Sequence, residues 1–235
     1  MHGTMRQIPL PIQSVDEHTF DYFNGENNPL LLASLHTHLA QPQPHFYFIF
    51  GQKSVGKSHL LKACCDEITQ HGGAASFLPL DTLCKLSPDL LHNLEYQDLV
   101  CLDDLHAIAG NPHWERAVFD LYNRINERQQ GELIISANAP ISELSLELPD
   151  LRSRLIWGEV YQLKPLSDEQ KMHILQQRAF ARGLILNDDA AQFLLKRHDR
   201  DLKNLFLTLN KLEHDTLEAQ KGNLTIPFLK DKLAL

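Results

Sequence analysis

A glycine-containing loop constrains the fold of this chain more than any other feature of the sequence. Residues 51–58 read GQKSVGKS and match the pattern G-x-x-x-x-G-K-[ST]. The loop follows an aromatic and β-branched run at 45–51, which predicts a buried strand, and leads into a helical pattern at 57–73. A phosphate-binding loop requires this order, because backbone N–H groups and the helix N-terminus must point at the same anion. A plain glycine turn is the alternative interpretation.

Each residue type in the loop has a predicted role. Gly51 and Gly56 permit the tight turn, the Lys57 ammonium reaches the β- and γ-phosphates, and the Ser58 hydroxyl binds Mg²⁺. We therefore expect a site for nucleotide phosphates. The residues expected to form it are Gly51, Gln52, Lys53, Ser54, Val55, Gly56, Lys57, Ser58 and His59.

An apolar run that ends in two acidic residues gives a second signal. Residues 99–104 read LVCLDD. A carboxylate at the end of a strand beside a phosphate loop can hold Mg²⁺, and we assign this role to Asp103. Asp104 lies where a base would orient the attacking water, and Asn138, which ends the run IISAN, lies where a polar side chain would reach the γ-phosphate. The alternative for LVCLDD is a strand that ends in a solvated turn.

Strand and helix patterns alternate along the first two thirds of the chain. Further strands are expected at 74–80, 98–104, 132–138 and 159–166, and further helices at 29–40 and 113–130. This alternation predicts an α/β fold with a parallel sheet covered by helices. From Ser167 onward the pattern is entirely helical, and Ser167 and Gln170 have capping-box spacing. We expect a leader (1–22), a P-loop domain (23–165) and a smaller all-helical lid domain (166–235).

Net charge restricts the class of partner. The chain carries a net charge of −8, and residues 1–165 hold 11 Lys and Arg against 20 Asp and Glu. A protein that grips DNA by itself usually presents a basic face, so we expect DNA contact to be indirect or weak. No apolar run approaches the roughly 20 residues that cross a bilayer, and no signal-peptide pattern opens the chain. We expect a cytoplasmic protein without membrane contact.

Cysteine and histidine residues lack the spacing of metal ligands. The four cysteines are expected to be small buried hydrophobic residues in a reducing compartment. His36 and His38 lie two apart, with no acidic or cysteine partner near them in the sequence, so we expect no metal site built from His or Cys. Trp114 and Trp157 are expected in the core.

Several motifs together resemble one family. GQKSVGKS, LVCLDD, IISAN, LRSRLIWG and RDLKNL occur in an order similar to that of the AAA+ ATPases. Within them, residues 19–235 most resemble the bacterial replication initiator DnaA, and TFDYFNGENN at 19–28 resembles the opening of its nucleotide-binding domain. We expect no counterpart here of the initiator's DNA-binding and helicase-interaction domains. A core of this kind resembles the Hda family, the regulatory homologues of the initiator.

The resemblance implies a mechanism that works across a subunit boundary. Arg154 is implied to be an arginine finger that enters the initiator's ATP site, where a guanidinium stabilises charge on the transferring phosphoryl group. Arg152 is the nearby competitor, and its alternative role is a surface ion pair. Asn138 is implied to be the first nucleotide sensor and Arg200 the second, which reports bound nucleotide from the lid. For Arg200, a structural ion pair with a neighbouring aspartate is the alternative.

Hda proteins also carry a short N-terminal peptide, roughly Q-L-[SP]-L-P-L, that binds the DNA polymerase III β sliding clamp. The segment QIPLPI fits this pattern, and the implied contact residues are Gln7, Ile8, Leu10, Pro11 and Ile12. Its prolines hold the segment extended and reduce the entropy lost on docking. The alternative is a strand packed against the chain's own sheet.

The implied function is therefore a clamp-tethered regulator that stimulates ATP hydrolysis by DnaA and prevents re-initiation. The implied cofactor is ADP or ATP with Mg²⁺, ADP first. Many AAA+ motors have Glu where this chain has Asp104, so we expect weak ATPase activity at most. The oligomeric state stays open, a homo-oligomer included. Competing interpretations are a helicase loader or replication adaptor, with a basic single-strand channel, and a P-loop enzyme acting on a small molecule.

Overall fold

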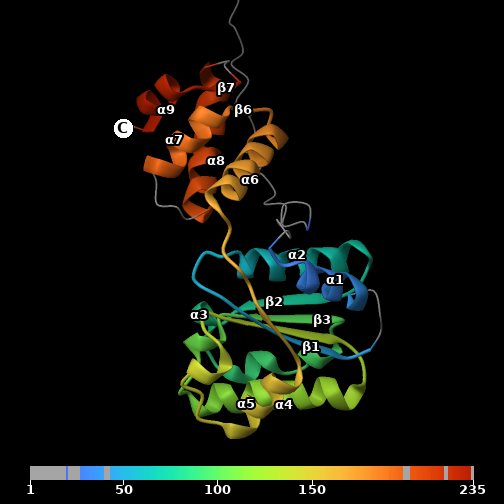
Figure 1. Cartoon of the computed structure of the whole chain (residues 1–235). Helices are drawn as coiled ribbons and strands as arrows, with labels where there is room; N and C mark the ends of the chain where they lie inside the picture. The colour runs from blue at the N-terminus through green and yellow to red at the C-terminus, as the bar shows by residue number, and fades with distance from the viewer. Residues whose placement is uncertain (1–19, 21–26, 40–42, 198–201, 220–221, 234–235) are drawn as a thin grey trace, which may run out of the picture.

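The computed structural model describes residues 20, 27–39, 43–197, 202–219 and 222–233. A layered α/β part carries the phosphate loop, and a helical part follows it in the chain (Figure 1). This arrangement confirms the predicted fold class. The precise domain limits at residues 22 and 165 stay predictions. Along the described residues, no helix is both long and apolar enough to span a membrane.

Five parallel strands form the central sheet, in the order β2-β3-β4-β1-β5. Their bounds are Ala75–Pro79 for β2, Leu99–Asp103 for β3, Glu132–Ala137 for β4, His45–Phe50 for β1 and Glu159–Gln162 for β5. Every residue of the inner strands β3 and β4 is buried, whereas the edge strands β2 and β5 are only partly covered. Strands that are covered on both faces are apolar along nearly their whole length. This explains why the runs LVCLD of β3 and LIIS of β4 form inner strands.

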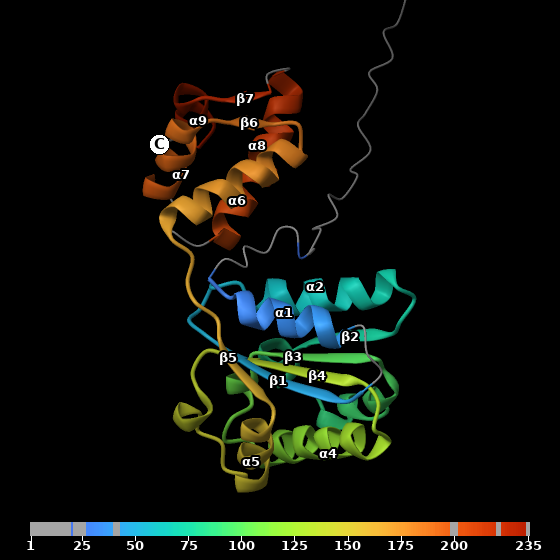
Figure 2. The same ribbon diagram turned by 45° about the vertical axis from the view of Figure 1, so that its right-hand side comes forward.

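Helices cover both faces of the sheet. Helices α1 (Pro29–His38) and α2 (Lys57–Gln70) lie on one face, and α4 (Pro112–Arg128) and α5 (Pro149–Trp157) lie on the other (Figures 1 and 2). Alternate residues of each strand enter two separate hydrophobic clusters, Phe48 with the α4 side and Ile49 with the α2 side. Successive side chains of a strand point to opposite faces of the sheet, so each strand contributes residues to both clusters.

The helical part begins with α6 (Asp168–Ala181), whose predicted capping box between Ser167 and Gln170 is confirmed. It continues with α7 (Asp188–Arg197), α8 (Leu202–Ala219) and α9 (Ile226–Leu233), around a core made mainly of leucine. Two short strands pair in parallel beside them, β6 (Ile185–Leu186) and β7 (Asn223–Leu224). The Asn27 side chain donates a hydrogen bond to the Pro165 carbonyl at 2.9 Å and another to Gln170, so residues before the sheet hold the connection to the helical part.

Some local predictions were wrong. The strand expected at 74–80 ends at Pro79 because Leu80 begins helix α3 (Leu80–Leu83), and the strand expected at 159–166 ends at Gln162. Short 3₁₀ helices lie at Pro88–Leu91, Leu94–Tyr96, Leu105–Ala107 and Ile141–Glu143. We did not predict them, because three or four residues are too few to show a periodic pattern.

The burial of single residues was predicted in part. Trp114 is buried as expected, but Trp157, the last residue of α5, is 74% exposed. Cys84 is only half-buried, whereas the other three cysteines are buried.

One buried acidic side chain lies at the start of β4. Glu132 is 3% exposed, and its Oε2 atom has no hydrogen-bond partner among the described residues. Burial raises the pKa of Glu132 from 4.5 to about 8. Between these two values the folded chain keeps a proton that the unfolded chain has lost, so this residue makes stability fall as pH rises.

We expect Glu132→Gln to remove this pH dependence. From the pKa difference, the wild-type carboxyl lowers the free energy of unfolding by up to roughly 3 kcal/mol at neutral pH. Urea unfolding between pH 5 and pH 8 should therefore give a flatter profile and higher stability at pH 8 for the variant. Glu127→Gln, at an exposed position of α4, should leave the profile unchanged. Parallel profiles for wild type and Glu132→Gln would contradict the assignment.

Candidate functional site

The phosphate loop joins the end of β1 to the start of α2. Gly56 has φ +109° and Ser54 has φ +63°, so the loop uses left-handed backbone at two places, and Gly56 caps the helix N-terminus. A Cβ atom at Gly51 would lie 2.8 Å from the Leu163 carbonyl oxygen, which requires glycine there. The Gly51 N–H donates to the Ala137 carbonyl at 3.2 Å and ties the loop to β4.

The Lys57 ammonium is held inside the loop. Its Nζ atom donates to the carbonyl oxygens of Gly51 at 2.9 Å and of Gln52 at 3.1 Å, and the residue is buried. Burial lowers the pKa of Lys57, while the charges of Asp104 and Asp103 act in the opposite direction. A desolvated cation beside a helix N-terminus is a strong partner for a phosphate oxygen.

The other predicted loop residues differ in exposure. Val55 is buried and His59 is half-buried, whereas the side chains of Gln52, Lys53, Ser54 and Ser58 are exposed. The exposed Ser58 hydroxyl at the start of α2 is open to a metal ion, as its predicted role requires. Backbone groups of this loop, together with Lys57 and Ser58, form a surface that fits a nucleotide phosphate chain with Mg²⁺.

Two aspartates lie at the end of the inner strand β3, Asp103 as its last residue and Asp104 directly after it, and both contact a serine that we did not predict. Ser136, buried in β4, donates its hydroxyl to Asp103 Oδ1 and accepts the Asp104 N–H at 3.0 Å. Asp103 is almost fully buried, and Asp104 has left-handed backbone with φ +61°. Burial and the neighbouring Asp103 charge raise the pKa of Asp104. A polar residue within the otherwise apolar run LIIS was the signal available in the sequence.

Strand order brings these groups to one edge of the sheet. β4 pairs with β1 on one side and with β3 on the other, and Phe50 is in register with Ala137. Asn138 follows directly after β4 and is exposed, so it lies between the phosphate loop and the aspartate pair. The parallel arrangement thus gathers Lys57, Asp103, Asp104 and Asn138, as expected for strands that end at the same edge.

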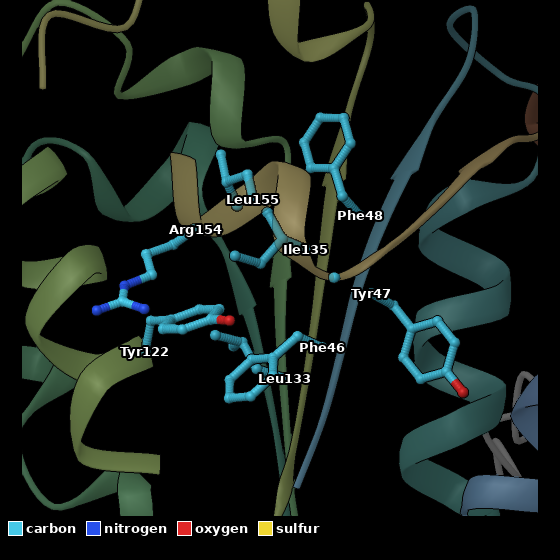
Figure 3. Close-up of a pocket in the computed structure, with 9 residues that line it drawn as sticks. Phe46, Tyr47, Phe48, Tyr122, Leu133, Ile135, Arg154 and Leu155 are labelled. Atoms are coloured by element: carbon cyan, nitrogen blue, oxygen red, sulfur yellow. The ribbon is translucent and has the colours of Figure 1, made fainter. Parts of the chain in front are cut away.

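Arg154 lies elsewhere. Figure 3 shows its side chain extended toward Tyr122, with Phe46 and Leu133 close by. The guanidinium carbon lies 5.6 Å from the centroid of the Tyr122 ring and 4.9 Å from that of Trp157. Tyr122 stacks on Phe46, which is near the start of β1, and a rise of about 3.3 Å per residue puts Phe46 roughly 16 Å before Gly51. The Arg154 guanidinium therefore lies toward the opposite end of β1 from the chain's own phosphate loop.

Arg152 and Arg154 differ in their partners. Arg152 donates from Nη2 to the Leu146 carbonyl at 2.8 Å, so it holds the loop that precedes α5. Within the part of the chain that the structure describes, Arg154 has aromatic contacts but no hydrogen-bond acceptor or carboxylate. The geometry therefore favours Arg154 over Arg152 as a cation available to another molecule.

Glu115, for which the sequence predicted no role, holds the N-terminal end of α5, the helix that carries Arg154. It is fully buried, and its carboxylate accepts the backbone N–H groups of Gly110, Glu147 and Leu148 at 2.7 to 3.1 Å. Leu148 caps the N-terminus of α5. Charge-assisted bonds to several backbone donors are stronger than neutral ones, so this carboxylate sets the position of α5 and of Arg154.

Two sets of predicted residues lie outside the described part of the chain. Arg200, the predicted second sensor, falls within residues 198–201. The predicted clamp-binding residues Gln7, Ile8, Leu10, Pro11 and Ile12 fall within residues 1–19.

Comparisons with known proteins agree with this architecture. The fold is similar to domain III of DnaA from Thermotoga maritima, with a TM-score of 0.75 and 20% identity over 93% of this chain and 96% of that one. It is also similar to a replication initiator DnaA bound to AMPPCP and single-stranded DNA, with a TM-score of 0.72 and 19% identity over 93% of this chain and 69% of that one. These likenesses show that the fold is that of the AAA+ proteins.

Sequence comparison extends the relationship beyond the fold. Residues 168–233 match the family model described as Hda, lid domain. An uncharacterized protein from Haemophilus influenzae is 47% identical over 230 residues, which cover 98% of this chain and 99% of that protein. The chain therefore belongs to one family with the Haemophilus influenzae protein, its residues 168–233 are similar to the Hda lid domain, and its fold is similar to that of DnaA domain III.

Proposed function

We propose that this protein regulates the initiation of DNA replication by binding ADP or ATP and supplying Arg154 to the ATP site of the initiator DnaA. The observation that carries the proposal is the separation of the Arg154 guanidinium, beside Tyr122 and Phe46 near the start of β1, from the chain's own phosphate loop, which follows the end of β1. A guanidinium with no acceptor among the described residues, beside the exposed Ile156 and Trp157, suits a contact with a second AAA+ molecule. Stimulated hydrolysis of ATP on DnaA would prevent re-initiation.

The nucleotide site of this chain supports the binding half of the proposal. Lys57 and the loop N–H groups would hold the phosphates of ADP or ATP, while Ser58 and Asp103 would hold Mg²⁺. When bound, Mg²⁺ would neutralise charge on the phosphate oxygens. Asp104 would orient water, but its side chain is shorter than the glutamate of many AAA+ motors, so we propose weak hydrolysis by this chain itself. Asn138, and Arg200 from the lid, would sense the phosphates.

We expect Lys57→Ala to weaken ADP binding about ten- to a hundredfold, because each hydrogen bond to a charged group contributes about 1.5–3 kcal/mol. Isothermal titration of the purified protein with ADP and Mg²⁺ measures the effect. Lys85→Ala is the matched control, since it makes the same change of charge at an exposed position outside the phosphate loop. Equal affinities for wild type and Lys57→Ala would remove the loop from the nucleotide site.

We expect Arg154→Ala to bind ADP normally and yet to lose stimulation of ATP hydrolysis by DnaA. An arginine finger accelerates hydrolysis by roughly 10³–10⁵, so stimulation should fall to background. Single-turnover hydrolysis of DnaA-bound ATP is the measurement. Arg154→Lys should also fail, because lysine lacks the planar fork that engages two phosphate oxygens.

Arg152→Ala is the matched control for this test. Arg152 contacts the Leu146 carbonyl, so its loss should lower stability and leave most of the stimulation intact in the folded protein. Full stimulation by Arg154→Ala, or loss of stimulation only in Arg152→Ala, would move the role away from Arg154.

We further propose that QIPLPI binds the DNA polymerase III β sliding clamp. Gln7→Ala combined with Leu10→Ala should abolish capture by the clamp and leave ADP affinity unchanged, because both residues lie outside the phosphate loop. A clamp pull-down and an ADP titration of the same preparation test both halves. Undiminished capture of the double variant would remove the tether from the proposal.

One comparison separates this function from a helicase loader or adaptor. Hydrolysis of DnaA-bound ATP is measured with this protein, with and without clamp loaded on DNA. Our proposal requires stimulation that depends on both clamp and Arg154. A loader would load its partner on DNA without changing the hydrolysis of ATP by DnaA.

A further inference from the structure

Three polar side chains from distant parts of the sequence meet at the edge of the sheet opposite the phosphate loop. His38 ends α1, His45 begins β1 and Glu159 begins β5. One ligand atom from each of the three lies within 4.8 Å of the others. Imidazole nitrogen and carboxylate oxygen are ligands that zinc accepts in proteins. The two histidines are near each other in the sequence, but the carboxylate arrives only through the pairing of β5 with β1.

Neighbouring groups hold each of the three side chains. The rings of His38 and His45 stack with their centroids 3.5 Å apart, and His38 Nδ1 lies 2.5 Å from the Tyr47 hydroxyl. Glu159 Oε2 accepts hydrogen bonds from Ser34 at 2.8 Å and from Tyr161 at 2.6 Å. Outer-shell hydrogen bonds of this kind orient the ligands of protein metal sites.

The donor atoms also suit a cation. Glu159 Oε1 lies 3.8 Å from His38 Nδ1, so a carboxylate oxygen faces an imidazole nitrogen. A divalent metal ion is a single partner that can engage both rings and the carboxylate.

We propose that His38, His45 and Glu159 bind one divalent transition-metal ion, with Zn²⁺ as the best fit. Bonds of about 2.0–2.1 Å in a tetrahedral site put ligand atoms roughly 3.3 Å apart, so binding would draw the three side chains together by side-chain rotation. The Glu159 side chain is 38% exposed and that of His38 is 21% exposed, which leaves room for water as a fourth ligand. The ion would join α1, β1 and the edge strand β5.

This site is separate from the proposed Mg²⁺ site. The latter is formed by oxygen atoms of Ser58 and Asp103 at the end of the strands, whereas the histidine–glutamate site lies at the start of β1 and β5 and offers nitrogen ligands. Nitrogen ligands favour zinc over magnesium. The two sites can therefore be loaded independently in one experiment.

The test uses the untagged full chain with ADP and excess Mg²⁺ present and a thiol reductant that does not bind zinc. Zn²⁺ affinity is measured by competition with a chromophoric chelator, and Co²⁺ absorption reports the ligand type. We expect one Zn²⁺ bound with micromolar or tighter affinity, and a Co²⁺ spectrum of nitrogen and oxygen ligands without thiolate bands. His45→Ala and Glu159→Gln should each weaken Zn²⁺ binding at least about tenfold.

Two further variants make the outcome decisive. His71→Ala is the matched control, because His71 and Glu67 form an exposed histidine–glutamate pair at the end of α2, with no third ligand among the residues that the structure describes. The affinity of this variant for Zn²⁺ should equal that of the wild type. Glu159→Gln keeps the size of the side chain, and Tyr161→Phe removes only one hydroxyl, so each tests the site with little disturbance of the fold. Wild-type affinity in His45→Ala and Glu159→Gln, or thiolate bands with Co²⁺, would overturn the proposal.

Discussion

The pairing of β4 with both β1 and β3 is the constraint on which the nucleotide site depends. It brings the ends of three strands together, and each end contributes a different chemical group: a lysine in a glycine loop, an amide and a pair of carboxylates. Ser136 of β4 contacts Asp103 and Asp104, and Ala137 of the same strand accepts the Gly51 N–H. The central strand therefore fixes the separation between the lysine and the carboxylates before any ligand binds.

Local patterns in the sequence predicted much of this fold. The change from strand to helix periodicity around GQKSVGKS identified β1 and α2, and the apolar runs before Asp103 and Asn138 identified β3 and β4. Those patterns work because buried parallel strands are apolar throughout and because a phosphate loop requires fixed glycines. Element ends were less predictable, since Leu80 continues an apolar run and yet begins a helix.

Contacts between distant segments were beyond the sequence. Glu115 looks like an ordinary helical residue until the loop before α5 turns the N–H groups of Glu147 and Leu148 toward it. Glu159 has no histidine near it in the chain, and only the neighbouring position of β5 and β1 brings it beside His38 and His45. Trp157 was wrongly expected in the core, because hydrophobic character alone does not indicate which side of a short helix is covered.

Gly158 connects α5, the helix that carries Arg154, to β5 and contacts the first strand, β1. A Cβ atom there would lie 2.5 Å from the Phe46 carbonyl oxygen, so the turn between α5 and β5 rests directly on the β1 backbone. The first residues of β1 therefore support α5 and its Arg154, and the phosphate loop follows the last residue of the same strand. The support of Arg154 and the chain's own phosphate loop therefore lie at opposite ends of one strand, which pairs with a parallel neighbour on each side.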